Sequence, residues 1–496
     1  MRTNLEKAQI GQNVPIRRLV TGLWQMADQE RDGKTYDLDA AAQALVEYAR
    51  DGFDSFDMAD HYGSAEIVAG MAHKALRDAG EPTPTILTKW CPAPGPMSEA
   101  TVRRGVETAL EQLDLPAVDV MQFHWWRYES SEYLTALGHL MRLREEGLIR
   151  EIGLTNFDAS HLNLVLKEGI AVGSNQVCFS LLDRRAAGAL SDVAAANGVS
   201  ILAFGTLCGG FLSDKWLGAP EPAKIDDWSR MKYKRFIDAS GGWGKFQSLL
   251  TALERLARKY EVSISNIATA WTLNHRAITA TIIGARLGEA EHRNDNKKAL
   301  NLQLDAQDLT AIEDVVNSMP AIPGDCGDEY RKPPFLTASG DLSHHLATMP
   351  AVFPVVQSTV RPERTLAESV SIWEEKAGFS RAIRSGNRIS VSGTTATGNE
   401  GNPVALGDPG AQTTFILDKI SAALEALGGT LGDVTRTRIY LRNEADWQAV
   451  SAVHASYFKD IRPANTMIAG ILLIGPYDVE IEVEADLFDG ESVSRD

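Results

Sequence analysis

Short apolar runs rich in β-branched residues alternate with amphipathic stretches through the first part of the chain. Eight such runs occur, and eight successive strand–helix units predict an α/β fold of the (β/α)8 type, a TIM barrel. A doubly wound sheet is the alternative. No Gly-X-Gly-X-X-Gly segment follows an early strand, so a Rossmann dinucleotide site is unsupported. The predicted strands are 19–24, the start of 52–66, 85–90, 118–124, 150–156, 174–179, 200–205 and 280–286.

The rhythm of the chain changes after the eighth unit. Prolines and glycines interrupt the pattern, so the barrel is predicted to span 1–340 and a linker 341–352. Beyond the linker, a hairpin around Gly386-Asn387 and further helices and strands predict a smaller α+β domain at 353–490. The other segments predicted there are helices at 411–427 and 446–459 and strands at 434–441, 467–473 and 479–487.

The composition is that of a soluble globular protein with more than one domain. The chain has 496 residues, 44% hydrophobic and 23% charged, with a formal net charge of -17. This charge argues against a nucleic-acid or anionic-membrane partner. The 4 cysteines include no Cys-X-X-Cys pair, which fits a reducing compartment. With no apolar signal-peptide core and no membrane-length apolar run, we expect a cytoplasmic enzyme or binding protein.

Polar side chains lie at or just beyond the ends of three successive predicted strands. Asp57 and Tyr62 follow the second strand, Lys89 is near the end of the third, and His124 ends the fourth. In a barrel these ends share one rim, so the side chains should converge. A tyrosine alone is a weak acid, but a lysine cation stabilises its phenolate, and a buried lysine needs a carboxylate partner. The set predicts a general acid for a carbonyl oxygen; no metal is expected, since the spacing matches no zinc motif.

This pattern resembles the aldo-keto reductases. The resemblance rests on Asp57-Met58-Ala59-Asp60-His61-Tyr62-Gly63, on Leu87-Thr88-Lys89 and on Gln122-Phe123-His124. It extends over the whole predicted barrel, because further segments stand in the order of the family. They are Gly153-Leu154-Thr155-Asn156, Asn175-Gln176, Ala203-Phe204-Gly205 and Ile283-Gly284-Ala285-Arg286.

The resemblance implies NAD(P)H-dependent reduction of an aldehyde or ketone, or oxidation of the corresponding alcohol. Tyr62 is then the general acid or base, Lys89 and Asp57 adjust it, and His124 orients the substrate. Arg286 implies NADP(H) rather than NAD(H), because an arginine can pair with the extra phosphate. The implied cofactor contacts are Thr155, Asn156 and Gln176 to the carboxamide, Phe204 on the nicotinamide ring, Arg286, Asp295 and Asn296 at the adenosine end, and Trp24 and Leu207 beside them.

Two segments around the predicted pocket are particular to this chain. Phe204-Gly205-Thr206-Leu207 stands where the family usually has Tyr-Ser-Pro-Leu, which keeps the ring but alters the pyrophosphate loop. The segment 213–245, rich in Trp and Lys, is expected to shape the substrate pocket. Aromatic side chains at strand ends are expected to form the wall of an aromatic substrate pocket. They are Trp24, His61, Trp90, Trp125 and Trp126.

The second domain resembles the Rid family (RidA, YjgF-like). The resemblance rests on Val391-Ser392-Gly393-Thr394, Pro463-Ala464 and Val479-Glu480-Ile481-Glu482, among other segments. It implies a homotrimer with ligand clefts between subunits, and active members hydrolyse imines with an arginine directly after Pro-Ala. Asn465 stands at that position, and an asparagine cannot pair bidentately with a carboxylate. We therefore expect an oligomerising or ligand-binding role rather than imine deaminase activity.

Three functions remain open from the sequence. The first is an NADP-dependent carbonyl reductase for a small molecule, with an appended oligomerising domain. The second is a regulatory protein that senses nucleotide redox state and a metabolite. The third uses both domains to process an imine or keto compound. The intact set Asp57, Tyr62, Lys89 and His124 favours the first.

Overall fold

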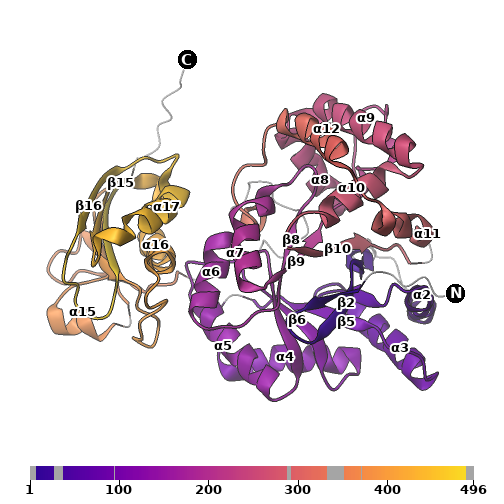
Figure 1. The fold of residues 1–496 in the computed structure, drawn as a ribbon. Coiled ribbons are helices and arrows are strands. Elements are labelled where there is room, and N and C mark those ends of the chain that lie inside the picture. Colours follow the sequence, from indigo (N-terminus) through magenta and orange to yellow (C-terminus); the bar gives the residue numbers. More distant parts are fainter. Residues whose placement is uncertain are drawn as a thin grey trace. The chain divides into compact units, whose positions relative to one another are not determined.

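The computed structural model describes residues 7–26, 37–93, 95–287, 292–331, 351–369 and 371–487. The chain forms two compact units, one with the barrel and a smaller one, most of which follows the barrel in sequence but which also takes in residues 127–135 and 160–170 (Figure 1). Most of the predicted linker, 341–350, lies outside the described residues. The domain boundaries at 340 and 353 therefore stay predictions.

Eight strands form the wall of the barrel: β3 (Leu19–Gly22), β4 (Ser55–Asp57), β5 (Thr85–Trp90), β6 (Val118–His124), β7 (Ile149–Thr155), β8 (Ser174–Cys178), β9 (Ser200–Phe204) and β10 (Ile278–Gly284). They close in the order β10-β3-β4-β5-β6-β7-β8-β9, and every neighbouring pair is parallel. Parallel strands need crossover connections, which the intervening helices supply. The predicted (β/α)8 barrel is confirmed, and the doubly wound alternative is wrong.

Amphipathic helices connect these strands. In α2 (Leu38–Arg50) the buried side chains include Ala41, Leu45 and Tyr48 at helical spacing, and the side chain of Asp37 caps its first turn. Ser64, directly before the next helix, makes no capping hydrogen bond through its side chain. The remaining helices of this unit are α3 (Ala65–Asp78), α4 (Glu99–Leu113), α5 (Glu132–Glu145), α6 (Ala159–Lys167), α7 (Ala189–Asn197), α8 (Trp228–Ala239), α9 (Gly242–Tyr260), α10 (Ile264–Leu273), α11 (Arg293–Asn296), α12 (Ala306–Asn317) and α13 (Asp328–Arg331).

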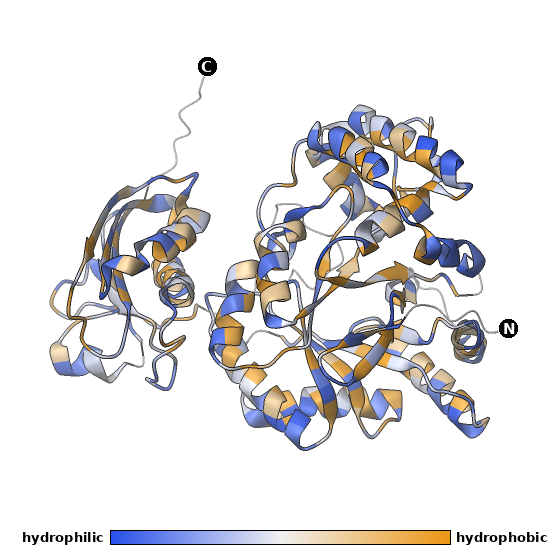
Figure 2. Ribbon diagram, in the orientation of Figure 1, coloured by the Kyte–Doolittle hydropathy of each residue, from blue (hydrophilic) through white to orange (hydrophobic). Residues whose placement is uncertain are grey.

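A hairpin that the sequence pattern did not predict packs against the barrel interior. Its strands, β1 (Lys7–Ile10) and β2 (Val14–Arg17), pair antiparallel. The buried Ile10, Val14 and Ile16 join one apolar cluster with side chains from the barrel strands (apolar residues are orange in Figure 2). Those side chains, mostly in the first halves of their strands, are Val20, Leu87, Val120, Leu202, Ala280 and Ile282. The hairpin therefore fills the amino-terminal end and leaves the carboxyl-terminal end for a site.

The smaller unit is a mixed sheet with helices, which confirms the predicted α+β domain. Its strands are β11 (Val355–Gln357), β12 (Arg364–Ala367), β13 (Ala382–Ser385), β14 (Arg388–Thr395), β15 (Val434–Leu441), β16 (Ala464–Ala469) and β17 (Val479–Asp486), and its helices α15 (Ile372–Ala377), α16 (Pro409–Ala426) and α17 (Trp447–Phe458). The strand order is β11-β12-β13-β14-β17-β15-β16. The pair β15–β16 is parallel and the other pairs are antiparallel.

One strand of this sheet was predicted in the wrong place. The apolar run at 467–473 suggested a strand there, but β16 covers Ala464–Ala469. Pairing with β15 begins at Ala464 opposite Arg436 and ends at Ala469, before Gly470 turns the chain with φ 78°. Pairing with β15, rather than the apolar run, thus sets the strand. Among the described residues, no helix has the length and apolar composition needed to cross a bilayer.

Candidate active site

A cavity of about 670 Å³ is lined by residues at the carboxyl-terminal ends of the barrel strands. This volume is within the range of small-molecule sites. Every residue that the sequence assigned to catalysis or cofactor binding contributes to the lining. They are Asp57, Tyr62, Lys89 and His124, together with Trp24, Thr155, Asn156, Gln176, Phe204, Leu207, Arg286, Asp295 and Asn296.

Asp57 and Lys89 form a buried ion pair at the base of this cavity wall. Lys89 Nζ lies 2.7 Å from Asp57 Oδ2 and also donates to the carbonyl oxygen of Met58 at 3.0 Å. The other carboxylate oxygen, Asp57 Oδ1, accepts from Gln122 Nε2 at 2.9 Å and from Gln176 Nε2 at 2.7 Å. Hydrogen bonds thus satisfy both oxygens of the carboxylate, which offsets the cost of burying the pair.

Tyr62 stands beside this pair. It lies in the loop between β4 and α3, and Lys89 Nζ is 5.2 Å from the centre of its ring. The ring of Trp24 packs edge-on against it, with centroids 4.9 Å apart. The lysine cation therefore faces the phenol that the sequence singled out as the acid, and the indole fixes the orientation of that ring.

His124 is buried at the end of β6 and is held as a neutral imidazole. Burial lowers the pKa of His124 well below its usual value, and nearby cations, first among them Arg331, act in the same direction. The ring packs on Trp126 at 4.2 Å, and Nδ1 lies 3.9 Å from Cys91 Sγ. Within the described residues Nε2 has no hydrogen-bond partner. A neutral imidazole with one unpaired nitrogen in a cavity is available to bind a ligand oxygen.

The end of β7 presents two further unpaired groups. Thr155 Oγ1 and Asn156 Oδ1 are buried, and neither has a hydrogen-bond partner in the described part of the chain. Asn156 adopts a left-handed backbone conformation, φ 60°, and its backbone amide donates to the backbone carbonyl oxygen of Gln176 at 2.8 Å. Buried polar atoms are normally paired, so this site fits a ligand amide such as the carboxamide of a nicotinamide. Gln176 differs from expectation, because its side-chain nitrogen bonds Asp57 and Gln122 rather than facing an empty position.

The far end of the cavity carries the residues predicted for the adenosine side. Arg286 Nη2 lies 2.5 Å from Asp227 Oδ2, a pair that the sequence did not suggest. Asp295 accepts from Ser263 Oγ at 2.8 Å and pairs with Lys298 at 3.1 Å. The arginine is thus already paired with a carboxylate, while Asp295 is fixed by its neighbours.

The difference from the usual family sequence directly after β9 has a steric reason. Gly205, where the family usually has serine, has φ 71°, and a Cβ atom there would lie 2.3 Å from Tyr233 Oη. A residue with a side chain would therefore have to displace the Tyr233 side chain and would be strained at this φ. Phe204 and Leu207 still line the cavity on either side of this turn.

The expected aromatic wall is only partly correct. Trp24, His61 and Trp126 line the cavity, whereas Trp90 and Trp125 do not. Trp90 and Trp125 are buried and both pack against Phe123, with ring centroids 5.6 and 5.8 Å from it. The strand-end position alone did not reveal this, because successive side chains of a strand point to opposite faces.

Two residues that no motif marked also line the cavity. Lys232 lies on α8, within the segment 213–245 that was expected to shape the pocket, and Tyr330 lies on α13. Lys232 is buried, with an exposed fraction of 6%, and its ammonium group donates to the hydroxyl of Tyr330. The only sequence signal was a lysine between aromatic residues, which is too common to identify a site.

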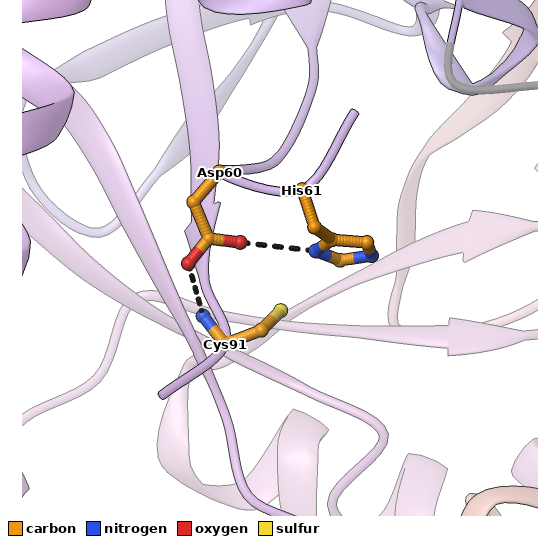
Figure 3. Close-up of side chains that lie close together, drawn as sticks. All are labelled: Asp60, His61 and Cys91. Carbon is orange, nitrogen blue, oxygen red and sulfur yellow. Dashed lines mark hydrogen bonds and ion pairs between the residues drawn. The ribbon is translucent and has the colours of Figure 1, made fainter. Parts of the chain in front are cut away.

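Asp60, His61 and Cys91 form a small cluster beside Tyr62 (Figure 3). Asp60 Oδ1 lies 3.0 Å from His61 Nδ1, and Asp60 Oδ2 accepts from the backbone amide of Cys91 at 2.9 Å. The oxygen, nitrogen and sulfur atoms lie within 4.8 Å of one another, a donor set that could hold a metal ion. Both carboxylate oxygens already have partners, so the contacts are accounted for by Asp60 bracing the Tyr62 loop against β5.

The second unit places its key position at the surface. Asn465, at the site of the family arginine, is exposed on β16 and donates to Thr437 Oγ1 at 2.8 Å. Thr437 Oγ1 in turn lies 3.0 Å from His454 Nε2. Burial raises the pKa of Glu480, whose carboxylate lies against Gly393. These contacts include no cation at position 465 that could bind a carboxylate.

Comparison with known proteins assigns each unit to a family. A family model described as the aldo/keto reductase family matches residues 18–317, and one described as endoribonuclease L-PSP matches residues 372–487. A glycerol dehydrogenase structure from Gluconobacter oxydans shares the barrel fold, with a TM-score of 0.54 and 20% identity, over 64% of this chain and 97% of that chain.

Three relatives cover different shares of the chain. The NADH-specific methylglyoxal reductase of Escherichia coli is 23% identical over 332 residues, 62% of this chain and 97% of that protein. Flagellar radial spoke protein 5 of Chlamydomonas reinhardtii is 28% identical over 43% of this chain, and the chain covers 44% of that protein. A RutC family protein of Pyrococcus horikoshii is 35% identical over 107 residues, 22% of this chain and 83% of that protein.

Proposed function

We propose that this chain, which belongs to the aldo/keto reductase family and carries a RutC-like second domain, reduces the carbonyl group of an aldehyde or ketone with NADPH. The same site can oxidise the corresponding alcohol with the oxidised cofactor. Family membership supports oxidoreductase chemistry with a nicotinamide cofactor. The substrate, the preference for NADPH and the residue roles below are our proposal.

Tyr62 is the proposed general acid. Its hydroxyl and the unpaired Nε2 of His124 bind the carbonyl oxygen, and the neutral imidazole orients that oxygen without competing for the proton. Thr155 and Asn156 would hold the carboxamide of a reduced nicotinamide, which would supply the hydride that the carbonyl carbon accepts. Tyr62 then donates its proton to the oxygen, and Lys89, 5.2 Å from the ring centre, stabilises the phenolate left behind. Asp57 keeps Lys89 charged and in place.

The observation that carries this proposal is the buried Asp57–Lys89 pair next to Tyr62. Its 2.7 Å contact lies in the same cavity as the unpaired nitrogen of His124. The unpaired Thr155 Oγ1 and Asn156 Oδ1 support a place for the nicotinamide carboxamide in that cavity. An acid, its activating cation and an orienting neutral group together match what carbonyl reduction requires.

The preference for NADPH rests on Arg286. A guanidinium at the adenosine end can pair with a 2′-phosphate, although Asp227, 2.5 Å away, competes for the same group. One relative is named as NADH-specific, so the preference has to be measured on this chain.

The test is turnover of the purified full chain. NADPH and NADH are each mixed with a panel of aldehydes and ketones, and the absorbance of the reduced nicotinamide is followed for wild type and Tyr62→Phe. We expect reduction of at least one carbonyl compound, with a loss of about 10² to 10⁴ in kcat for Tyr62→Phe. If wild type turns over nothing faster than Tyr62→Phe does, the reductase proposal is wrong.

For the second domain we propose oligomerisation, as a trimer, rather than imine hydrolysis. The exposed apolar side chains that follow β16, Leu472 at 87% and Ile474 at 91% exposure, support an association surface. A mass measurement of the full chain in solution tests this, and a strict monomer at micromolar concentration would contradict it. We also propose that the protein is cytoplasmic.

A further inference from the structure

A second buried lysine, Lys232, lines the same cavity as the Asp57–Lys89 pair. This ammonium group is buried, donates to the hydroxyl of Tyr330, and has rings on several sides. Its Nζ lies 4.4 Å from the ring centre of Tyr330 and 5.1 Å from that of Phe204. Further rings lie at 5.8 and 6.0 Å, those of Tyr233 and Phe236. Cation–π contacts of this kind only partly replace the lost hydration of an ammonium group.

Lys232 differs from Lys89 in having no acidic partner. Among the described residues, no carboxylate forms an ion pair with Lys232, whereas Lys89 is 2.7 Å from Asp57. Two buried acids, Asp183 and Glu329, act electrostatically on the neighbouring Tyr233, but both pair with Arg185, at 2.7 and 2.9 Å. A buried charge without a counter-ion destabilises the protein, unless a ligand provides one.

The lysine is also close to the proposed reaction centre. Tyr330, which accepts its hydrogen bond, packs edge-on against His124 with ring centroids 5.6 Å apart. The charge of Lys232 is one of those that lower the pKa of His124, together with Arg331 and Lys89. In a chain with a net charge of -17, this end of the cavity therefore collects positive charge.

We propose that Lys232 and the hydroxyl of Tyr330 bind an anionic group of the substrate, so that the preferred substrates are carbonyl compounds that carry a carboxylate. Such a group would supply the missing counter-ion, and its position next to His124 would direct the carbonyl oxygen of the same molecule toward Tyr62. This inference rests on the proposed reductase function and names the substrate class of that site.

The experiment compares acids with their own methyl esters. The probes are 4-carboxybenzaldehyde and succinic semialdehyde, each beside its methyl ester, which keeps the reacting aldehyde and removes the charge. We expect wild type to favour each acid that it reduces. Lys232→Met should lower kcat/KM for the acid about tenfold or more, and leave that of the ester within about threefold. Lys232→Arg should keep most of the preference, and Tyr330→Phe should lose part of it.

The matched control is Lys234→Met, on the same helix. Lys234 pairs with Glu221 and Asp238 and does not line the cavity, so its loss should leave the acid-to-ester ratio unchanged. A ratio that Lys232→Met does not alter would overturn the inference. So would a fall in NADPH affinity of the same size for Lys232→Met, measured by fluorescence titration, because Lys232 would then belong to the nucleotide site.

A binding measurement separates this inference from the proposed function. Calorimetry with benzoate and its neutral analogue benzamide needs no turnover. Benzoate should bind wild type more tightly than benzamide, and Lys232→Met should remove the difference while Lys234→Met keeps it. If no carbonyl compound is reduced but this pattern holds, the reductase proposal fails and the anion site stands. If both probes bind wild type equally or not at all, the anion site fails.

Discussion

The residues that carry the family resemblance are buried and paired in the barrel, whereas the corresponding position of the second unit is exposed. In the barrel, Asp57 and Lys89 are buried and tied to each other, and Asp57 is tied to two glutamines. In the second unit, Asn465 is exposed on β16 and makes a hydrogen bond to Thr437. A buried charged network is costly unless all its members are present, whereas a surface asparagine can change without such a penalty. Chemistry is therefore expected to depend on the barrel network and to be insensitive to position 465.

The largest expected effect tests the barrel network itself. The double variant Asp57→Asn with Lys89→Met removes both charges together, which avoids leaving one buried charge unpaired. We expect kcat to fall about 10³-fold, because the Tyr62 phenolate loses its stabilising cation, with cofactor affinity changed much less. Steady-state kinetics and fluorescence titration measure the two quantities.

Lys74→Met is the control for this variant. Lys74 is exposed and pairs with Asp78 on the outside of α3, so its loss should leave kcat unchanged. A double variant of Asp57 and Lys89 that retains more than about a tenth of wild-type kcat would show that the network is structural rather than catalytic.

The second effect concerns Glu66, a buried acid directly after the Tyr62 loop. Burial raises the pKa of Glu66 to about 7, although Thr88 Oγ1 donates to it at 2.5 Å, and Oε2 has no partner in the described part of the chain. Because the folded pKa lies above the ordinary 4.5, this group favours the folded state at low pH, and that stability is lost as pH rises from about 4.5 to about 7. Glu66→Gln should therefore be the more stable protein at pH 8, by about 3 kcal/mol, and should match wild type at pH 4.5.

Urea unfolding at the two pH values measures this difference. Glu313→Gln, an exposed change on α12, should give the same free energy of unfolding as wild type at both. Equal stabilities of Glu66→Gln and wild type at pH 8 would mean that Glu66 is paired or solvated when ionised.

A smaller effect is expected at the pair Arg286–Asp227. Arg286→Ala should lower the ratio of kcat/KM for NADPH to that for NADH about tenfold, because the 2′-phosphate loses its cation. Asp227→Asn should raise the same ratio, because it removes the carboxylate that now holds Arg286 at 2.5 Å. Ratios unchanged by both substitutions would remove Arg286 from the nucleotide site.

The smallest effect is expected in the second unit. Asn465→Ala should leave carbonyl reduction within about twofold of wild type and cost about 1 kcal/mol of stability at most, since it removes one hydrogen bond at the surface. An assay of carbonyl reduction measures the first effect, and thermal unfolding measures the second. A large loss of reduction would make the second unit part of the reaction, and the contrast between the two units would fail.

The order of the barrel strands and the meeting of the proposed catalytic residues in one cavity could be predicted from the sequence. Strand–helix alternation specifies a barrel, and parallel strands place their carboxyl ends at one rim, so Asp57, Lys89 and His124 had to lie close together. Local signals were sufficient because each of these residues is fixed by its own strand. The same local signals misplaced β16, because an apolar run does not show where pairing with the neighbouring strand begins.

Tertiary structure alone decided which polar groups remain without a partner. Lys232 and Tyr330 are separated by 98 positions and meet only because α8 and α13 pack over the same cavity. Gln122 and Gln176 reach Asp57 from two other strands, so the pairing of that carboxylate was invisible in any one segment. Periodicity shows which side of an element is buried, but charge balance inside a cavity depends on every element around it. The sequence therefore predicted the acid and its cation, and the fold decided that Lys89 has a carboxylate partner and Lys232 has none in the described residues.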